Sequence, residues 1–203
     1  MRQIAAIILA AGEAKRFRQS PSETKLTVEL ECKPLIRHVA EAALSSVAQP
    51  VLLVTGHAHE QVLRALDGLS LERIHNRDPG AGLAASLRLA VGALPNTARG
   101  AVILLGDMPR IAPSLINRLI GAFDKAPVEP PAVVPIHRGR RGNPALIGRS
   151  LFAQIMTLEG DKGAAALIGS RAGVVEMPVD DRAIEIDVDT CEDLRQLQGT
   201  RAV

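Results

Sequence analysis

Residues 4–12 read Ile-Ala-Ala-Ile-Ile-Leu-Ala-Ala-Gly, and this short stretch decides the fold. Its first six residues are all apolar, which is typical of a strand that is buried on both faces of a sheet. The run leads to Gly12, which lets backbone N–H groups approach a bound anion closely. Because ligands of open α/β sheets bind beyond the carboxyl ends of the strands, we expect a binding site here.

The same apolar pattern returns six times further along the chain. These runs span residues 51–55, 71–74, 101–105, 132–135, 174–177 and 184–188. Apolar residues with helical spacing stand between several of them, at 35–47, 62–66, 83–94 and 115–123. The alternation predicts an α/β fold: a single Rossmann-like domain over residues 1–203, with a mostly parallel sheet and helices on both faces.

The composition limits the classes of function. Hydrophobic residues make up 47% of the 203 residues, which is enough for one sizeable core. A net charge of +2, with no Trp or Tyr and only three Phe, argues against nucleic acid as a partner. The amino terminus has too short an apolar run for a signal peptide or a membrane span, so we expect a cytoplasmic protein without membrane contact.

Cationic side chains follow the first predicted strand. Arg16 and Lys25 stand in the polar segment after Gly12, and both could neutralise the charge of a triphosphate. The segment contains no GxGxxG motif, and GxxxxGK[ST] occurs nowhere in the chain. Dinucleotide cofactors and P-loop hydrolysis are therefore disfavoured, and a different phosphate-binding loop is indicated.

Polar residues also follow later strands. Asn76 comes after the third run and offers both a donor and an acceptor for a base edge or a ribose hydroxyl. Asp107 follows the fourth run, and Asp187 and Asp189 point the same way from the last one, so one or both could face Asp107. Since Mg²⁺ commonly takes two carboxylates and a triphosphate, the pattern predicts a magnesium site.

With these residues the chain resembles the MobA-like nucleotidyltransferases, and among them the molybdenum cofactor cytidylyltransferases. The resemblance covers nearly the whole chain, and its motifs stand in a fixed order at the predicted strand ends. The motifs are residues 9–12 with 16–17, 25–26, 33–35, 76 with 82 and 86–87, 106–109, 141–144, 160–164 and 187–194. Each motif alone is weak evidence for the family, but all of them in this order are specific evidence for it.

The resemblance implies a nucleotide-diphospho-sugar transferase-like fold and a role for each group of residues. The catalytic residues would be Arg16, Lys25 and Asp107, and Mg²⁺ would be held by Asp107 and Asp189. The nucleotide would be bound by Leu9, Ala10, Ala11, Gly12, Arg16, Lys25, Asn76, Ser86 and Asp107. The acceptor substrate would be bound by Gly142, Asn143, Pro144, Gly160, Asp161 and Lys162.

The resemblance also implies the substrates. Family guanylyltransferases tend to have a second glycine where Ala11 stands, which favours CTP as the NTP. The acceptor would be the phosphate of molybdopterin, with release of pyrophosphate and transient contact with a molybdoenzyme or its chaperone. The chain departs from the family pattern at Ala14, where Ser is usual, and at Arg18, where a small residue is usual. Three alternatives stay open: a guanylyltransferase, transfer to another small phosphorylated acceptor, and a nucleotide or cofactor carrier without turnover.

Overall fold

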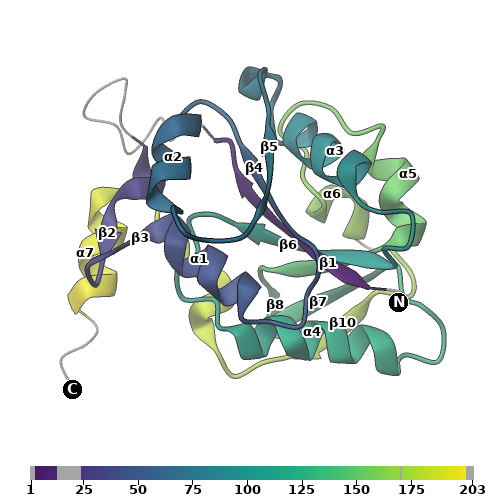
Figure 1. Cartoon of the computed structure of the whole chain (residues 1–203). Helices are drawn as coiled ribbons and strands as arrows, with labels where there is room; N and C mark the ends of the chain where they lie inside the picture. Colours follow the sequence, from purple (N-terminus) through teal and green to yellow (C-terminus); the bar gives the residue numbers. More distant parts are fainter. Residues whose placement is uncertain (1–2, 13–23, 170, 200–203) are drawn as a thin grey trace.

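The computed structural model describes residues 3–12, 24–169 and 171–199, and it is built on one mixed sheet (Figure 1). The sheet has eight strands in the order β10-β7-β9-β6-β1-β4-β5, with β8 paired to β7. The strands are β1 (Ile4–Ala10), β4 (Val51–Thr55), β5 (Glu72–His75), β6 (Gly100–Leu105), β7 (Ala132–His137), β8 (Arg140–Arg141), β9 (Ala145–Gly148) and β10 (Val175–Pro178). A separate antiparallel hairpin joins β2 (Glu29–Leu30) to β3 (Lys33–Pro34).

The central strands run parallel, as expected for apolar runs that are buried on both faces. β1 pairs in parallel with β4 on one side and with β6 on the other. Ala10 lies opposite Thr55, and Leu9 lies opposite Leu105. The carboxyl ends of these three strands therefore meet at one edge of the sheet. β9 runs antiparallel between β6 and β7.

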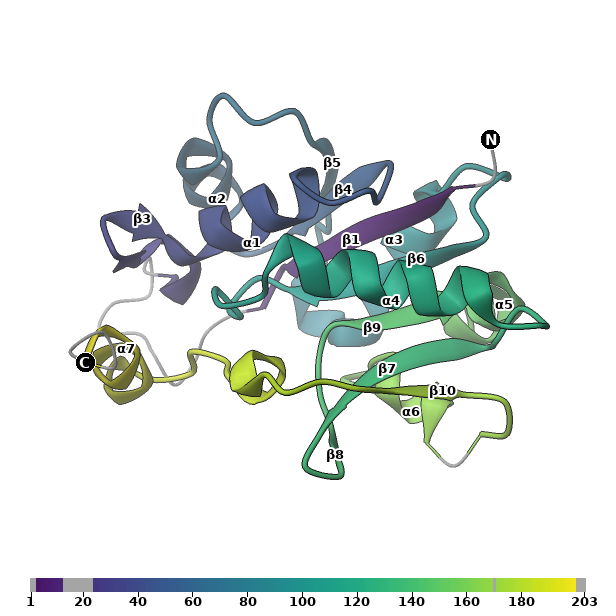
Figure 2. The same cartoon turned by 90° about the horizontal axis from the view of Figure 1, so that it is seen from below.

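Helices cover both faces of the sheet, as Figures 1 and 2 show. One face is covered by α1 (Leu35–Leu44), α2 (His59–Ala65) and α4 (Pro113–Lys125). The other face is covered by α3 (Leu83–Ala93), α5 (Phe152–Ile155) and α6 (Ala165–Ile168). This arrangement confirms the predicted fold class. No helix in the described ranges is long and apolar enough to cross a membrane.

Three details differ from the sequence prediction. Residues 184–188 form no strand, because a 3₁₀ turn, η4 (Arg182–Glu185), begins where Asp181 Oδ1 accepts a hydrogen bond from Ala183 N at 2.8 Å. β9 was not predicted, since its four residues gain their partners only from distant strands. α1 ends at Leu44, so Val47 lies outside it and is 66% exposed.

The last described segment packs on the β2–β3 hairpin. α7 (Cys191–Gly199) begins with a reciprocal cap in which Thr190 N donates to Asp193 Oδ2 at 2.7 Å and Asp193 N donates to Thr190 Oγ1 at 3.2 Å. Figure 1 shows α7 in yellow beside β2 and β3. A small third cluster is buried between them, formed by Leu30, Leu35, Val188 and Leu197.

Candidate active site at the carboxyl ends of the strands

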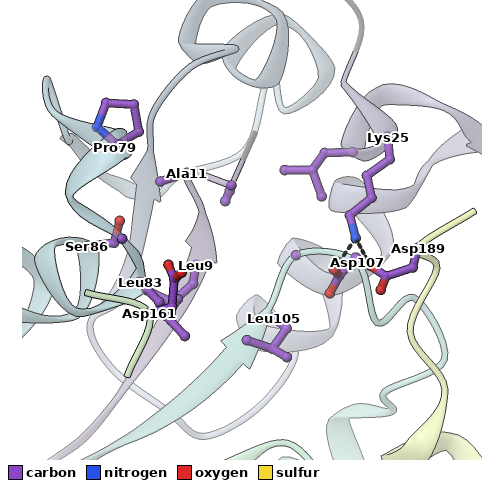
Figure 3. A pocket seen from close by; sticks show the side chains of 16 residues that line it. Leu9, Ala11, Lys25, Pro79, Leu83, Ser86, Leu105, Asp107, Asp161 and Asp189 are labelled. Carbon is purple, nitrogen blue, oxygen red and sulfur yellow. Dashed lines mark hydrogen bonds and ion pairs between the residues drawn. The ribbon is translucent and has the colours of Figure 1, made fainter. Parts of the chain in front are cut away.

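A cleft of about 480 Å³ opens at the carboxyl ends of the central strands (Figure 3). Figure 3 shows Pro79 and Ser86 at one end of this cleft and Lys25, Asp107 and Asp189 at the other. The lining residues are Leu9, Ala10, Ala11, Gly12, Lys25, Leu26, Pro79, Gly80, Gly82, Leu83, Ser86, Leu105, Gly106, Asp107, Asp161 and Asp189. The cleft therefore has one end with a lysine and two carboxylates, and a second end where Asp161 is the charged side chain among those labelled in Figure 3. We call the first of these the charged end.

Lys25 forms the centre of the charged end. It begins the 3₁₀ turn η1 (Lys25–Thr27), whose first turn is capped by the buried Thr24. Lys25 Nζ lies 2.7 Å from Asp107 Oδ2 and 2.6 Å from Asp189 Oδ1. The lysine side chain is 12% exposed, Asp107 19% and Asp189 32%, so the ion pair with Asp107 is the better shielded from water.

Asp107, Asp187 and Asp189 form a carboxylate cluster, in which one oxygen of each residue lies within 4.8 Å of the others. The segment holding Asp187 and Asp189 is fixed beside Asp107, because Val188 N donates to Asp107 O at 3.0 Å. The second carboxylate oxygen, Asp107 Oδ1, is buried and has no hydrogen-bond partner in the described chain. Hard oxygen ligands with one unsatisfied buried oxygen fit a divalent cation.

The charges of this cluster perturb two pKa values. Burial acts to lower the pKa of Lys25, but the attraction of Asp107 and Asp189 outweighs it, and the pKa lies above its usual value. Burial raises the pKa of Asp187, and the negative charges of Asp107 and Asp189 raise it further. Ionisation of Asp187 is thus disfavoured in the absence of a further cation.

The turn after β6, which contains Gly106 and Asp107, lies against the end of β1. Gly106 N donates to Leu9 O at 3.0 Å, which ties the turn after β6 to the end of β1. A side chain at Gly106 would be crowded, since a Cβ there would lie 2.8 Å from Ile36 Cδ1 and 3.1 Å from the backbone oxygen of Leu9. The glycine therefore allows Asp107 to enter the cleft directly after a buried strand.

Asn76, predicted to contact the nucleoside, lies behind the cleft wall. The residue is 3% exposed, and its side-chain Nδ2 donates to Ser86 Oγ at 3.0 Å. Its Oδ1 accepts a hydrogen bond from Asp78 N, also at 3.0 Å. Ser86 lines the cleft, whereas Asn76 does not. Asn76 thus reaches the cleft only through Ser86.

The two segments predicted to bind the acceptor lie in different places. Gly160 O accepts a hydrogen bond from Ala84 N at 3.0 Å, so Gly160 packs on the start of α3 and the next residue, Asp161, lines the cleft. Lys162 is exposed and does not line it. Residues 142–144 also lie outside the lining, and Asn143 N donates to Ile184 O at 2.9 Å, which places them beside the segment that leads to Asp187.

Most of the predicted nucleotide residues share this cleft: Leu9, Ala10, Ala11, Gly12, Lys25, Ser86 and Asp107. Arg16 lies outside the described residues. Pro79, Gly80 and Leu83 also line the cleft and were not predicted. Their only signal in the sequence is their position in the segment that follows the third apolar run.

Comparisons with known proteins identify the family and the fold. Residues 6–174 match the MobA-like NTP transferase domain. The chain is 30% identical over 136 residues to the bifunctional protein GlmU of Sorangium cellulosum. The aligned region covers 64% of this chain and 28% of that relative. The match therefore spans under a third of the length of this curated relative.

Solved structures resemble the whole described fold. The crystal structure of Rv0371c from Mycobacterium tuberculosis is 29% identical, covers 97% of this chain and 98% of its own, and has a TM-score of 0.81. A second structure of Rv0371c, at 28% identity and a TM-score of 0.82, with 98% and 99% of the two chains covered, is a complex with manganese. The 4-diphosphocytidyl-2C-methyl-D-erythritol synthase of Anaerococcus prevotii has a TM-score of 0.75 at 14% identity over 98% and 96% of the two chains, a likeness of fold alone.

The family match covers most of the chain, the fold is that of the nucleotide-diphospho-sugar transferases, and the cleft lies where the parallel strands end. The chain belongs to the MobA-like NTP transferase family.

Proposed function

We propose that the protein transfers CMP from CTP to the phosphate of a molybdopterin-type acceptor and releases pyrophosphate. The single observation that carries this proposal is the charged end of the cleft, where Lys25 Nζ lies between Asp107 and Asp189. A cation next to a carboxylate cluster suits a triphosphate and the divalent ion that accompanies it. The opposite end, with Ser86, then takes the nucleoside.

The carboxylate cluster would hold Mg²⁺ through Asp107 and Asp189, with Asp187 as a further ligand. Magnesium held there would supply positive charge to neutralise the phosphates in the transition state. The presence of manganese in a 28% identical relative and the unpartnered oxygen of Asp107 both support this assignment.

The chain's own side chains act by neutralising charge and by aligning the reactants. Lys25 exchanges its two carboxylate partners for phosphate oxygens and stabilises the pyrophosphate that leaves. An oxygen of the acceptor phosphate attacks the α-phosphorus, the bond to the β-phosphate oxygen breaks, and its electron pair remains on pyrophosphate. The backbone around Gly12 approaches the phosphates without a side chain in the way.

This chemistry requires no general base. The second pKa of a phosphomonoester is about 6, so its oxygen is largely anionic at neutral pH. No His or Cys of the described residues lines the cleft, which is compatible with that requirement. CTP is favoured because Ala11 stands where family guanylyltransferases tend to have glycine, and Arg16 is expected to join Lys25 at the phosphates.

Release of pyrophosphate from each of the four NTPs, with and without molybdopterin, tests the proposal. We expect turnover with CTP and molybdopterin in Mg²⁺, and little with the other nucleotides. A strong preference for GTP would overturn the base assignment, and turnover with another phosphorylated acceptor alone would overturn the acceptor. No turnover with any NTP, together with tight nucleotide binding, would identify a carrier.

A further inference from the structure

Arg110 links two elements that lie far apart in the sequence. Its Nη1 atom lies 2.9 Å from Glu31 Oε1 in an ion pair, and its Nη2 atom donates a hydrogen bond to Leu197 O at 3.1 Å. Glu31 stands in the turn between β2 and β3, and Leu197 stands in the last turn of α7. The side chains of Arg110 and Glu31 are 31% and 22% exposed, so water and salt screen this ion pair only in part.

The carbonyl group of Leu197 is one that α7 cannot satisfy by itself. The last four carbonyl groups of an α-helix have no partner within the helix, and a cation near them also meets the negative end of the helix dipole. The side chain of Leu197 is buried and packs in the small cluster with Leu30, Leu35 and Val188. The carboxyl end of α7 is therefore held both by apolar contacts and by the guanidinium group of Arg110.

Each of the three segments that meet at Arg110 carries one member of the charged end of the cleft. Arg110 itself follows Asp107 in the turn after β6, and the buried Met108 anchors this turn in the core. The β2–β3 hairpin follows Lys25 along the chain, and α7 begins just after Asp189. One guanidinium group thus joins the segments that bring the lysine and the two carboxylates together.

The contacts of Arg110 lie outside the cleft, because Arg110, Glu31 and Leu197 are not among its lining residues. In the ligand-free protein Lys25 also joins the three segments, since its Nζ atom contacts both Asp107 and Asp189. Under the proposed function Lys25 exchanges these partners for phosphate oxygens, and the segments lose that link. The link through Arg110 does not involve the ligands and is kept.

We infer that Arg110 is a positioning residue that keeps Lys25 and Asp189 next to Asp107. The inference rests on the proposed function, which gives the charged end of the cleft its ligands. The hydrogen bond from Val188 N to Asp107 O, at 3.0 Å, fixes the segment before α7, and Arg110 fixes the far end of this helix. With α7 held at both ends, the carboxylate of Asp189 has little freedom to turn away from the proposed metal site.

Binding of Mn²⁺ to the nucleotide-free protein, followed by electron paramagnetic resonance of the free ion, tests the inference. Arg110→Gln should weaken Mn²⁺ binding about tenfold, the lower end of the loss that follows removal of a group that orients metal ligands. Arg110→Lys keeps the charge but has a single nitrogen for two partners, so its affinity should lie between those of the parent and of Arg110→Gln. Arg118→Gln is the matched control, because Arg118 Nη2 also donates to a distant carbonyl, Pro178 O at 3.0 Å, and it should leave Mn²⁺ binding unchanged.

A second pair of measurements separates positioning from general support of the fold. Urea unfolding of Arg110→Gln and of Arg118→Gln should give similar losses of stability, since each change removes one contact to the carbonyl of a distant element. In an Asp189→Asn background, Arg110→Gln should weaken Mn²⁺ binding no further, because the carboxylate that Arg110 positions is no longer there.

The outcomes distinguish the inference from the proposed function. Mn²⁺ binding by Arg110→Gln within about twofold of the parent would overturn the positioning role and leave the proposed function intact. Losses of Mn²⁺ binding that add in the double variant would also contradict it. If Arg110→Gln does not fold, Arg110→Lys takes its place, and unchanged Mn²⁺ binding by that variant overturns the inference. If the parent protein binds no Mn²⁺, the proposed metal site is wrong and the inference fails with it.

Discussion

Lys25 Nζ lies 2.6 Å from Asp189 Oδ1, although the two residues are 164 positions apart in the sequence. The same ammonium group lies 2.7 Å from Asp107 Oδ2. A protein cation therefore stands between the two carboxylates proposed to bind Mg²⁺. A divalent ion that binds both must displace this ammonium group, and a triphosphate would give it new partners. Binding of the metal and of the nucleotide should consequently favour each other.

Lys25→Met should raise the affinity of the nucleotide-free protein for Mn²⁺ while lowering turnover by roughly 10² or more. Methionine keeps the apolar stem and removes the ammonium group that competes with the metal. Electron paramagnetic resonance of free Mn²⁺ measures the affinity, and pyrophosphate release measures turnover. Lys33→Met, which removes an ion pair with Glu41, is the matched control and should change neither. Equal or weaker Mn²⁺ binding by Lys25→Met would contradict the competition.

Asp107→Asn should lower turnover by roughly 10² or more, and excess Mg²⁺ should not restore it. The amide can neither carry the negative charge that a divalent cation needs nor pair with Lys25. We also expect weaker Mn²⁺ binding and a small loss of stability in EDTA, because Lys25 loses its ion pair with Asp107. Asp124→Asn, at an ion pair with Arg99, serves as control. Full activity of Asp107→Asn at any metal concentration would remove the proposed metal ligand.

Asp187→Asn should raise the melting temperature at pH 7 in EDTA. The pKa of Asp187 in the folded protein lies above the usual value of 3.8, so its contribution to stability is favourable below that value and is lost as the pH rises through the folded pKa. Ionised Asp187 therefore destabilises the metal-free protein at neutral pH. The advantage of the variant should shrink toward pH 4, and saturating Mg²⁺ should reverse it.

The control for this prediction is Glu72→Gln, at an exposed carboxylate in β5. Its melting temperature should differ little from that of the parent in EDTA and in Mg²⁺. Thermal unfolding followed by circular dichroism at several pH values gives both comparisons. A lower melting temperature for Asp187→Asn at pH 7 in EDTA would show that the carboxylate is stabilised in the metal-free cluster.

Gly82→Ala should destabilise the protein, and Gly92→Ala, ten residues along the same helix, should not. Gly82 has a φ of +89°, and a Cβ there would lie 2.3 Å from the carbonyl of Gly160, so alanine would push residues 160–161 off the start of α3. We expect a loss above ~1 kcal/mol and weaker nucleotide binding. Gly92 has nothing within 4 Å, and alanine should gain roughly 0.5–1 kcal/mol. Urea unfolding measures both, and shifts of the same sign would contradict the argument.

The parts of the fold that were predictable are those whose signal is local. Residues 4–9 are uniformly apolar because a central parallel strand has no exposed face, and this pattern is visible in the sequence itself. The cleft could be predicted for the same reason, since parallel strands place Gly12 and Asp107 at one edge. The parallel pairing of β1 with β4 and β6 confirms the predicted α/β class.

The parts that were not predictable depend on distant partners. Residues 184–188 were expected to be a strand, but their apolar side chains face two separate clusters and no strand pairs with them in the described sheet. The convergence of Asp187 and Asp189 on Asp107 comes instead from the hydrogen bond of Val188 N to Asp107 O. Likewise, nothing in the sequence near Asn76 indicates that its side-chain Nδ2 donates a hydrogen bond to Ser86, ten residues on.

The small cluster of Leu30, Leu35, Val188 and Leu197 holds Asp189 next to Lys25 from outside the main sheet. A unit with so few buried apolar contacts should open more often than the strands of the sheet, without global unfolding. Each such opening would separate Asp189 from Lys25 while the sheet stays intact. Amide hydrogens of α7 and of the β2–β3 hairpin should therefore exchange together and well before those of β1, and ligands that bridge Lys25 and Asp189 should slow that exchange.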